Sequence, residues 1–347
     1  MSNYHLPAEW HSQENIWLSW PHNLETWSEQ DLPKVEWEFA CFVAELSEVV
    51  RVQLLVKNDQ HADYIRDLLG SFRVDLASVV YHVIPTNDAW IRDYGPDFVY
   101  DISKSKKVLI NWEYNAWGGK YPPFDSDNSV NHSIVKMYDV MESPDMILEG
   151  GSIEVNGEGD LLTTKSCLLN PNRNPHLDKQ KIENELKQFL GVEKIHWLST
   201  GIAGDDTDGH IDDFARFLNS DTIVFSYTSD VSHPDFKFYQ DLKKELEVIC
   251  LKSGGKPKLI PLPVPEPLYF DGDILPCSYA NFLICNGKIL VPTFNSVKDK
   301  QAIEVIKNLI NFDVVGIPCS NIIKGLGSLH CLSKHEFKNI YSSETIS

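Results

Sequence analysis

The sequence predicts an α/β fold built from a repeated strand–helix–strand unit. Short runs rich in β-branched and aromatic residues recur along the chain. A turn-rich loop, an amphipathic helical pattern and a second strand-like run follow each of them, and this order occurs five times. Alternation alone is typical of any α/β protein. Five units of unequal length further predict a closed, pseudo-symmetric ring with no exposed sheet edge.

The first strand and first loop of each unit are recognised by composition. The strands are short and apolar, and the loops each contain an Asn or Ser, as turns commonly do. The expected first strands begin at residues 16, 108, 160, 222 and 288, and the loops after them contain Asn23, Asn115, Asn170, Ser229 and Asn295.

The helices and second strands follow in each unit. The first helix has the clearest pattern, because Val35, Phe39, Val43 and Val50 lie on one apolar stripe and Pro33 occupies a tolerated first-turn position. The first unit also contains an extra helix over 59–69 and a strand from 79. The expected helices span 33–50, 128–142, 178–190, 235–250 and 298–310, and the second strands begin at residues 51, 145, 193, 257 and 312.

Length and hydropathy predict one cytoplasmic domain. No low-complexity linker divides residues 1–347, so we expect a single catalytic domain. The first residues lack the basic and apolar segments of a signal peptide, and the apolar runs are too short to cross a bilayer. The seven cysteines are odd in number and irregularly spaced, without a CxxC pair, which argues against a disulfide framework or a structural zinc site.

The formal net charge of −19 restricts the partners. Nucleic acid would be repelled, and the sequence contains no basic stripe to offset this. A small cationic molecule would instead be attracted to a cleft lined by carboxylates, although acidic residues also simply keep a surface solvated.

Polar residues cluster in loops that follow strands. The clusters are NDAWIRDYGPD from residue 87, LEGGSIEV from 148, GDDTDGHIDDFARF from 204, and GLGSLHC from 325. Asp and Gly in loops are most often turn formers. The third cluster is harder to explain in that way, because five aspartates around His210 repel one another unless they bind a cation or face water.

Two kinds of cation fit this cluster. Asp206, Asp208, His210 and Asp212 alternate, so on a strand they would share one face and could bind Mn²⁺ or Zn²⁺. An organic guanidinium would instead pair with carboxylates in a planar, bidentate way. The second interpretation also gives Cys331 a function, because a thiolate can attack a guanidinium carbon while a histidine moves protons.

The motifs WIRDYGP, LEGGSIEVNGEG, LLTTKSCLLNPNRNP, DDTDGHIDDFARF and GSLHC, in this order, resemble the agmatine deiminase family of the guanidino-group-modifying superfamily. Bacterial peptidylarginine deiminases are near relatives. The resemblance runs from about residue 7 to Cys331. It implies a five-bladed pseudo-symmetric α/β propeller with a central active site, and hydrolysis of agmatine to N-carbamoylputrescine and ammonia without a metal or organic cofactor.

The resemblance also implies residue roles. Cys331 is expected to be the nucleophile, and His210 the general acid and then the base. Glu149 would brace His210 or bind one guanidinium nitrogen, while Asp93 and Asp212 would clamp the guanidinium. Trp90 would stack on the substrate, and Asp206 is a weaker candidate.

Two departures from the family pattern bear on these expectations. Many members carry GGGNIHC where this chain has GLGSLHC, so Leu326 and Ser328 would reshape the loop and affect substrate choice. Asp213 stands where Asn is expected, and on a strand it would point away from Asp212 and be peripheral.

Several alternatives stay open. Free arginine and peptidyl arginine present the same guanidinium as agmatine. A metal-dependent amidinohydrolase and a non-catalytic polyamine-binding protein are alternatives from other classes, and only the covalent mechanism needs Cys331. The sequence is compatible with a homo-oligomer.

Overall fold

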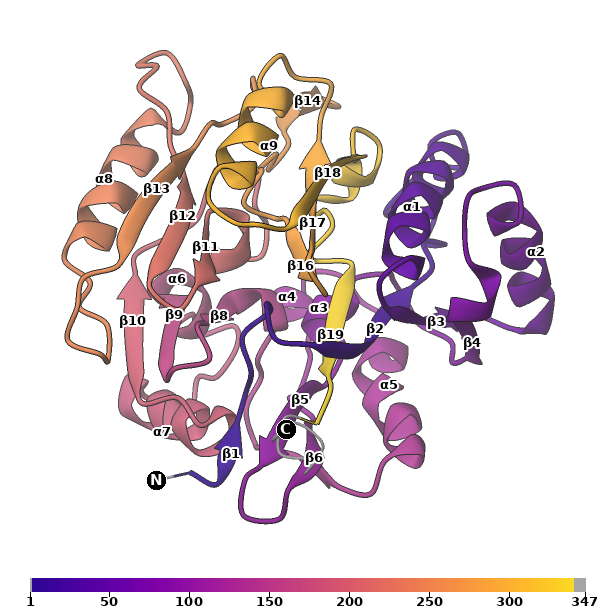
Figure 1. Cartoon of the computed structure of the whole chain (residues 1–347), viewed down its shortest axis with the longest axis horizontal. Helices are drawn as coiled ribbons and strands as arrows, with labels where there is room; N and C mark the ends of the chain where they lie inside the picture. Colours follow the sequence, from indigo (N-terminus) through magenta and orange to yellow (C-terminus); the bar gives the residue numbers. More distant parts are fainter. Residues whose placement is uncertain (1, 340–347) are drawn as a thin grey trace.

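The computed structural model describes residues 2–339, and it is a mixed α/β structure. Five parallel strand pairs form its basis, each joined by a helix (Figure 1). All five predicted first strands are present. The pairs are β2 (Gln13–Ser19) with β3 (Arg51–Val56), β6 (Lys106–Ile110) with β7 (Met141–Glu142), β9 (Asp160–Thr164) with β10 (Lys194–Leu198), β12 (Thr222–Ser226) with β13 (Lys258–Leu262), and β17 (Lys288–Thr293) with β18 (Asp313–Pro318).

All five expected connecting helices are present, but the one expected over 128–142 ends at Ile134, and the 3₁₀ helix η2 (Val135–Met137) and β7 follow it. The predicted stripe of α1 (Leu32–Ser47) is buried at Val35, Phe39 and Val43, and Pro stands in its first turn. The added helix α2 (Asp59–Leu69) and strand β4 (Val79–Val83) of the first unit are also present. Figure 1 shows the helices on the outside of the sheets. They are α1 (Leu32–Ser47), α5 (Asp125–Ile134), α7 (Lys179–Leu190), α8 (Phe236–Glu247) and α9 (Asp299–Lys307).

One predicted strand is wrong. A second strand was expected from residue 145, but β7 ends at Glu142. Pro144 follows closely, and because proline has no amide hydrogen it cannot continue the ladder. Only an isolated bridge between Glu113 and Ile147 extends the pairing, and the chain then turns into the 3₁₀ helix η3 (Gly150–Ser152).

A third, antiparallel strand was not predicted for any unit. It pairs with the far edge of the first strand, and in the first unit it comes from the C-terminal part of the chain, where β19 pairs with β2. Within residues 2–339 the sheets are separate, so the predicted ring is not one continuous closed sheet. The antiparallel strands are β5 (Asp97–Asp101), β8 (Ile153–Val155), β11 (Ala215–Asn219), β16 (Leu283–Cys285) and β19 (Ser333–Phe337).

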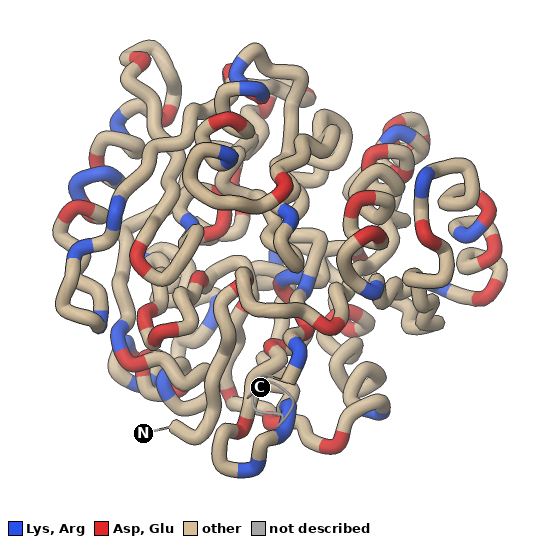
Figure 2. Tube along the Cα trace, viewed as in Figure 1, with Lys and Arg blue, Asp and Glu red and all other residues tan. Residues whose placement is uncertain are grey.

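Short elements complete the structure. Strand β1 (Tyr4–His5) extends the sheet of β5, and β14 (Tyr269–Phe270) with β15 (Asp273–Ile274) forms a hairpin. Acidic and basic residues are mixed along the outer helices (Figure 2), as in the ion pair of Lys237 with Asp241 on α8. Among the described residues no helix has the length and apolar character needed to span a membrane.

Candidate functional site

Four of the predicted site residues, and one residue that was not predicted, stand in the short segments just before the antiparallel strands. Because each such strand leads out of one unit and into the next, the five segments bring distant parts of the chain together. A cavity of about 700 Å³ opens beside them. The residues concerned are Asp93 before β5, Glu149 before β8, Asp212 before β11, Asn281 before β16 and Cys331 before β19.

Cys331 lies at the cavity, almost fully buried. Its backbone carbonyl accepts a hydrogen bond from the Arg92 amide, which holds the turn against α3 (Ile91–Tyr94). Its Sγ lies 3.8 Å from Asp212 Oδ2. Burial, and then the nearby carboxylates of Asp212 and Asp213, raise the pKa of the thiol well above its usual value. Without a bound cation the sulfur is therefore a protonated thiol near neutral pH.

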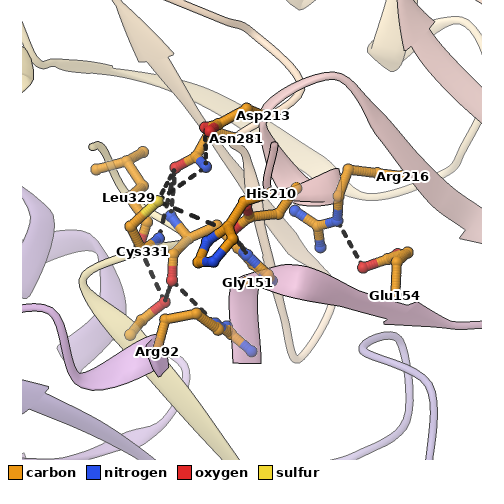
Figure 3. Close-up of polar contacts among 12 residues, drawn as sticks. Arg92, Gly151, Glu154, His210, Asp213, Arg216, Asn281, Leu329 and Cys331 are labelled. Atoms are coloured by element: carbon orange, nitrogen blue, oxygen red, sulfur yellow. Dashed lines mark hydrogen bonds and ion pairs between the residues drawn. The ribbon is translucent and has the colours of Figure 1, made fainter. Parts of the chain in front are cut away.

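Asn281 is a site residue that the sequence analysis missed (Figure 3). Its amide nitrogen donates to Cys331 Sγ and to Asp213 Oδ1, both at 3.1 Å. Its carbonyl oxygen accepts from Ser328 Oγ at 2.8 Å and from the His330 amide at 3.1 Å. The side chain thus anchors the nucleophile loop and directs an N–H toward the sulfur. The signal was a polar residue before a short apolar strand, the position that Asp93 and Glu149 also occupy.

Asp212 and Asp213 are not on a strand, contrary to prediction. They lie in the 3₁₀ helix η4 (Ile211–Asp213), and both are buried. Asp213 lines the cavity and bonds Asn281, so it belongs to the site and is not peripheral. The predicted alternation along residues 206–212 fails for the same reason, because positive φ values of 70° at Asp208 and 106° at Gly209 turn the chain.

His210 is enclosed by two of the predicted carboxylates. Its Nδ1 lies 3.7 Å from Asp93 Oδ1 and its Nε2 lies 4.0 Å from Glu149 Oε2. Nε2 is buried and has no hydrogen-bond partner within the described part of the chain. Burial lowers the pKa of His210 to about 4, against the opposing charge of Glu149. The ring is therefore neutral near pH 7 and free to accept a proton.

The double glycine after Glu149 permits this enclosure. A Cβ on Gly150 would lie 2.2 Å from the Arg92 carbonyl oxygen, and one on Gly151 would lie 2.6 Å from His210 Nδ1. The Gly151 amide donates to Asp93 Oδ1 at 2.9 Å. Because neither glycine has a side chain, the backbone can approach Arg92 and His210 this closely.

We expect Gly151→Ala to damage the site more than the fold. The added methyl would press on His210, Asp93 and Asp212 at once, and such overpacking typically costs about 1–3 kcal/mol. kcat/KM should fall by about tenfold or more. Gly255→Ala is the matched control, because its methyl would meet only Ser253 Oγ at 3.7 Å. Wild-type kcat/KM and Tm in Gly151→Ala would show that the close approach is not required.

Asp93 has partners from two later segments of the chain. Besides the Gly151 amide, its Oδ2 accepts from Trp117 Nε1 at 3.0 Å. Trp117 has a φ of 55°, a backbone conformation that costs energy in a bulky residue and is often found at functional sites. Trp117 was not among the residues predicted from the sequence. Burial raises the pKa of Asp93, with its hydrogen bonds opposing the rise.

Arg173 is a second buried residue that was missed. Its Nε bonds Glu149 Oε1 at 2.6 Å and its Nη1 bonds Asp208 Oδ2 at 2.6 Å. Arg173 comes from the motif LLNPNRNP, so the sequence contained a signal for it in the family pattern. Since Arg173 occupies one oxygen of Glu149, only Oε2 is left to face His210.

The remaining predicted residues line the cavity. Trp90 packs against Trp27 with ring centroids 5.3 Å apart. Asp206 is half-buried, accepts from the Tyr121 hydroxyl, and its backbone oxygen accepts from Lys120. The cavity is strongly acidic. Its carboxylates belong to Glu25, Asp88, Asp93, Asp127, Asp206 and Asp213, and its basic residues are Lys120 and Lys324.

Two groups of described residues place metal-type donors within 4.8 Å of one another. They are Glu149 with Cys167 and His210, and Asp212 with Asp213 and Cys331. Arg173 competes for Glu149 in the first group, and a metal in the second would occupy the sulfur. Either group would need a soft or borderline divalent ion, because each contains a thiol.

Comparison with known proteins gave matches along nearly the full chain. The family model of Porphyromonas-type peptidyl-arginine deiminases matches residues 5–336. An agmatine deiminase of Pseudomonas aeruginosa is 34% identical over 96% of this chain and 95% of its own. Among solved structures, an agmatine deiminase of Enterococcus faecalis has a TM-score of 0.90 at 30% identity, covering 97% of both chains. A substrate-bound cysteine-to-serine variant of C. jejuni agmatine deiminase has a TM-score of 0.87 at 33% identity, covering 96% of both.

Proposed function

This chain belongs to the Porphyromonas-type peptidyl-arginine deiminase family, and we propose that it acts there as an agmatine deiminase, hydrolysing agmatine to N-carbamoylputrescine and ammonia. One observation carries the proposal: Cys331, His210 and buried carboxylates meet at a single acidic cavity, in a chain similar over nearly its full length to agmatine deiminases.

The proposed reaction begins with the guanidinium held by Asp93 and Asp212. Binding of this cation lowers the thiol pKa of Cys331, and His210 is the neutral base available to take its proton. The thiolate attacks the guanidinium carbon and forms a C–S bond. His210 then gives its proton to one nitrogen, and the C–N bond breaks. Ammonia departs, and a thiouronium remains covalently attached to Cys331.

The second half returns the enzyme to its starting state. Water attacks the thiouronium carbon while His210 takes a proton from it, the C–S bond breaks, and the ureido product forms with Cys331 restored. Glu149 Oε2 braces His210 in this scheme, because Arg173 holds the other oxygen. Trp90 supplies a flat wall for the substrate, and Asp206 adds a carboxylate to the lining of the cavity.

Agmatine is proposed as the substrate because of the charges that line the cavity. Lys120 is paired with Asp208 at 2.9 Å and Lys324 with Asp31 at 2.7 Å, so neither of these lining cations is free for the carboxylate of arginine. The second positive charge of agmatine suits the acidic lining. A carboxylate placed there would meet like charges at a cost of roughly 3 kcal/mol, about 100-fold.

We therefore expect kcat/KM for agmatine to exceed that for L-arginine by about 100-fold. Ammonia release from agmatine, L-arginine and a blocked arginine peptide should be measured at one ionic strength. The preference over arginine should shrink as salt is added, since it is electrostatic. Equal or better turnover of either arginine compound would overturn the agmatine assignment. Loss of activity after exhaustive chelation would favour a metal-dependent amidinohydrolase instead.

The proposal also covers the domain organisation, the arrangement of the five units and the cellular location. Residues 1–347 act as a single catalytic domain, and the five units are blades of a pseudo-symmetric propeller with the site at its centre. Support comes from the shared strand order of the five sheets and from the pairing of β19 with β2. The enzyme works in the cytoplasm, as a monomer or homo-oligomer, without a cofactor, nucleic acid or membrane partner.

A further inference from the structure

A buried chain of three titratable groups leads away from the cavity behind Asp212. His330 Nδ1 lies 2.6 Å from Asp212 Oδ2, and His330 Nε2 lies 2.5 Å from Glu9 Oε1. The side chains of all three are buried or nearly so. His330 precedes the nucleophile in sequence, yet neither it nor Glu9 has a part in the proposed reaction.

The geometry determines which atom donates at the Glu9 end. Glu9 Oε2 lies 2.8 Å from Arg216 Nη2, an arginine that also pairs with Glu154 at 2.8 Å (Figure 3). A carboxylate in an ion pair with a buried guanidinium is ionised and can only accept a hydrogen bond. The pKa of Glu9 is indeed held well below its usual value, since Arg216, His335 and His330 outweigh the effect of burial. His330 Nε2 must therefore carry a hydrogen and donate it to Glu9.

The contact between His330 Nδ1 and Asp212 must then contain one shared proton. An oxygen and a nitrogen at 2.6 Å cannot both be bare acceptors. Either Asp212 is protonated and His330 is neutral, or Asp212 is ionised and His330 is an imidazolium. No other assignment is compatible with an ionised Glu9.

The groups around this contact favour the first state while no substrate is bound. Asp212 is buried and faces Asp93, which raises its pKa well above the usual value. His330 is buried, and Arg216 and Arg92 lie close enough to lower its pKa despite Glu9. His335 adds no proton here, because its Nε2 donates to the Ile284 carbonyl and its Nδ1 accepts from Arg92.

A guanidinium bound at Asp212 favours the second state, in which Asp212 is ionised and His330 is an imidazolium. Asp212 Oδ1 is buried and has no hydrogen-bond partner among residues 2–339, so it is free to accept from a substrate. We propose that Glu9 and His330 are positioning residues that keep the proton of Asp212 within the protein. Substrate binding moves this proton from Asp212 Oδ2 to His330 Nδ1. The O–H bond of Asp212 breaks and an N–H bond forms on His330, whose Nε2 hydrogen stays on the ring and is still donated to Glu9, so that Asp212 ionises without releasing a proton to solvent.

This inference rests on the proposed function, because it requires a guanidinium at Asp212. The test is titration calorimetry with agmatine in buffers of different ionisation enthalpy, which counts the protons released per ligand bound. Cys331→Ala is the background, since it stops turnover and removes the thiol proton. His330→Asn is added to it, because an amide can donate to Asp212 but cannot take up a proton.

We expect the double variant to release about one proton more per agmatine than Cys331→Ala alone, and to bind more weakly as the pH falls. A merely structural role for His330 would weaken binding without changing the proton count. Equal proton release in both proteins overturns the inference while leaving the proposed function intact. Absence of binding to Cys331→Ala would remove the proposed substrate and the inference together.

Glu9→Gln provides a second test that does not depend on the folding of His330→Asn. Loss of the carboxylate opposite Nε2 disfavours the imidazolium, so a fraction of a proton should be released on binding. In the Cys331→Ala protein, ¹⁵N-histidine spectra should also show one ring change from neutral to doubly protonated when agmatine is added. An unchanged proton count with Glu9→Gln, or the absence of such a ring, overturns the inference.

Discussion

Replacement of Cys331 by alanine is expected to abolish agmatine turnover while agmatine still binds. The thiolate forms the bond to the guanidinium carbon in the proposed mechanism, and no other side chain can replace it. In other enzymes, loss of the catalytic nucleophile lowers kcat by a factor on the order of 10⁶. Binding should persist, because the clamp carboxylates and the acidic lining remain. Ammonia release and calorimetric titration measure the two effects separately.

The control for this change is Cys250→Ala. Cys250 is exposed and stands outside the cavity lining, so its removal should leave kcat unchanged. In that background, acid-quenched His210→Ala protein should show added substrate mass on the peptide that contains Cys331, provided thiol attack still proceeds. Ammonia release at the wild-type rate from Cys331→Ala would exclude a covalent mechanism and leave the chain as a binding protein or a metal enzyme.

Asp212→Asn and Asp93→Asn should each lower kcat/KM by about 30- to 5,000-fold, the range for breaking a desolvated charge pair at roughly 2–5 kcal/mol. Each carboxylate both binds the cation and orients its carbon, so kcat and KM should change together. Asp93→Asn also places an amide against the Gly151 N–H or the Trp117 indole, both of which donate to Asp93 in the native protein. Steady-state kinetics with agmatine measure the effect.

Asp178→Asn is the matched carboxylate-to-amide control. Asp178 caps α7 by accepting from the Lys181 amide, and asparagine caps a helix equally well. Asp213→Asn is not a control, because Asp213, which was expected from the sequence to be peripheral, lines the cavity and accepts from Asn281. If either clamp variant kept kcat/KM near that of Asp178→Asn, its carboxylate would be a turn former without a role in substrate binding.

Composition and periodicity were enough to predict the parallel strands of the five pairs except β7, and the existence of the five connecting helices. The stripe of α1 and the apolar run of β17 are long enough to express a regular pattern in their own residues. The antiparallel strands were not predicted. β8 and β16 have only three residues each, too few for a recognisable pattern. β5, β11 and β19 have five residues each but carry charged residues such as Asp97, Arg216 and Lys334, so they lack a continuous apolar run. Pro144 was visible in the sequence, but its effect on the neighbouring ladder was not taken into account.

The site residues also divide into those that could be predicted from the sequence and those that could not. Cys331, His210 and Glu149 stand in motifs whose residue types have few other uses, and the cavity collects Cys331 and His210 with Asp93. Asn281 and Arg173 were missed because an asparagine and an arginine in a loop have many uses. Asp213 was misplaced because its direction depends on η4, and a three-residue 3₁₀ helix has no sequence period of its own.

The sequence by itself determined the α/β elements, the acidic character and the identity of the chemically distinctive residues, since these depend on composition and on neighbours within a few positions. The tertiary structure decided which of those residues meet. Glu9 and His330 are 321 residues apart along the chain, and β19 reaches β2 from the opposite end. Contacts of this kind arise when distant segments pack together and exclude water from their polar groups, so the protonation of Asp212 and the state of the thiol cannot be derived from local sequence.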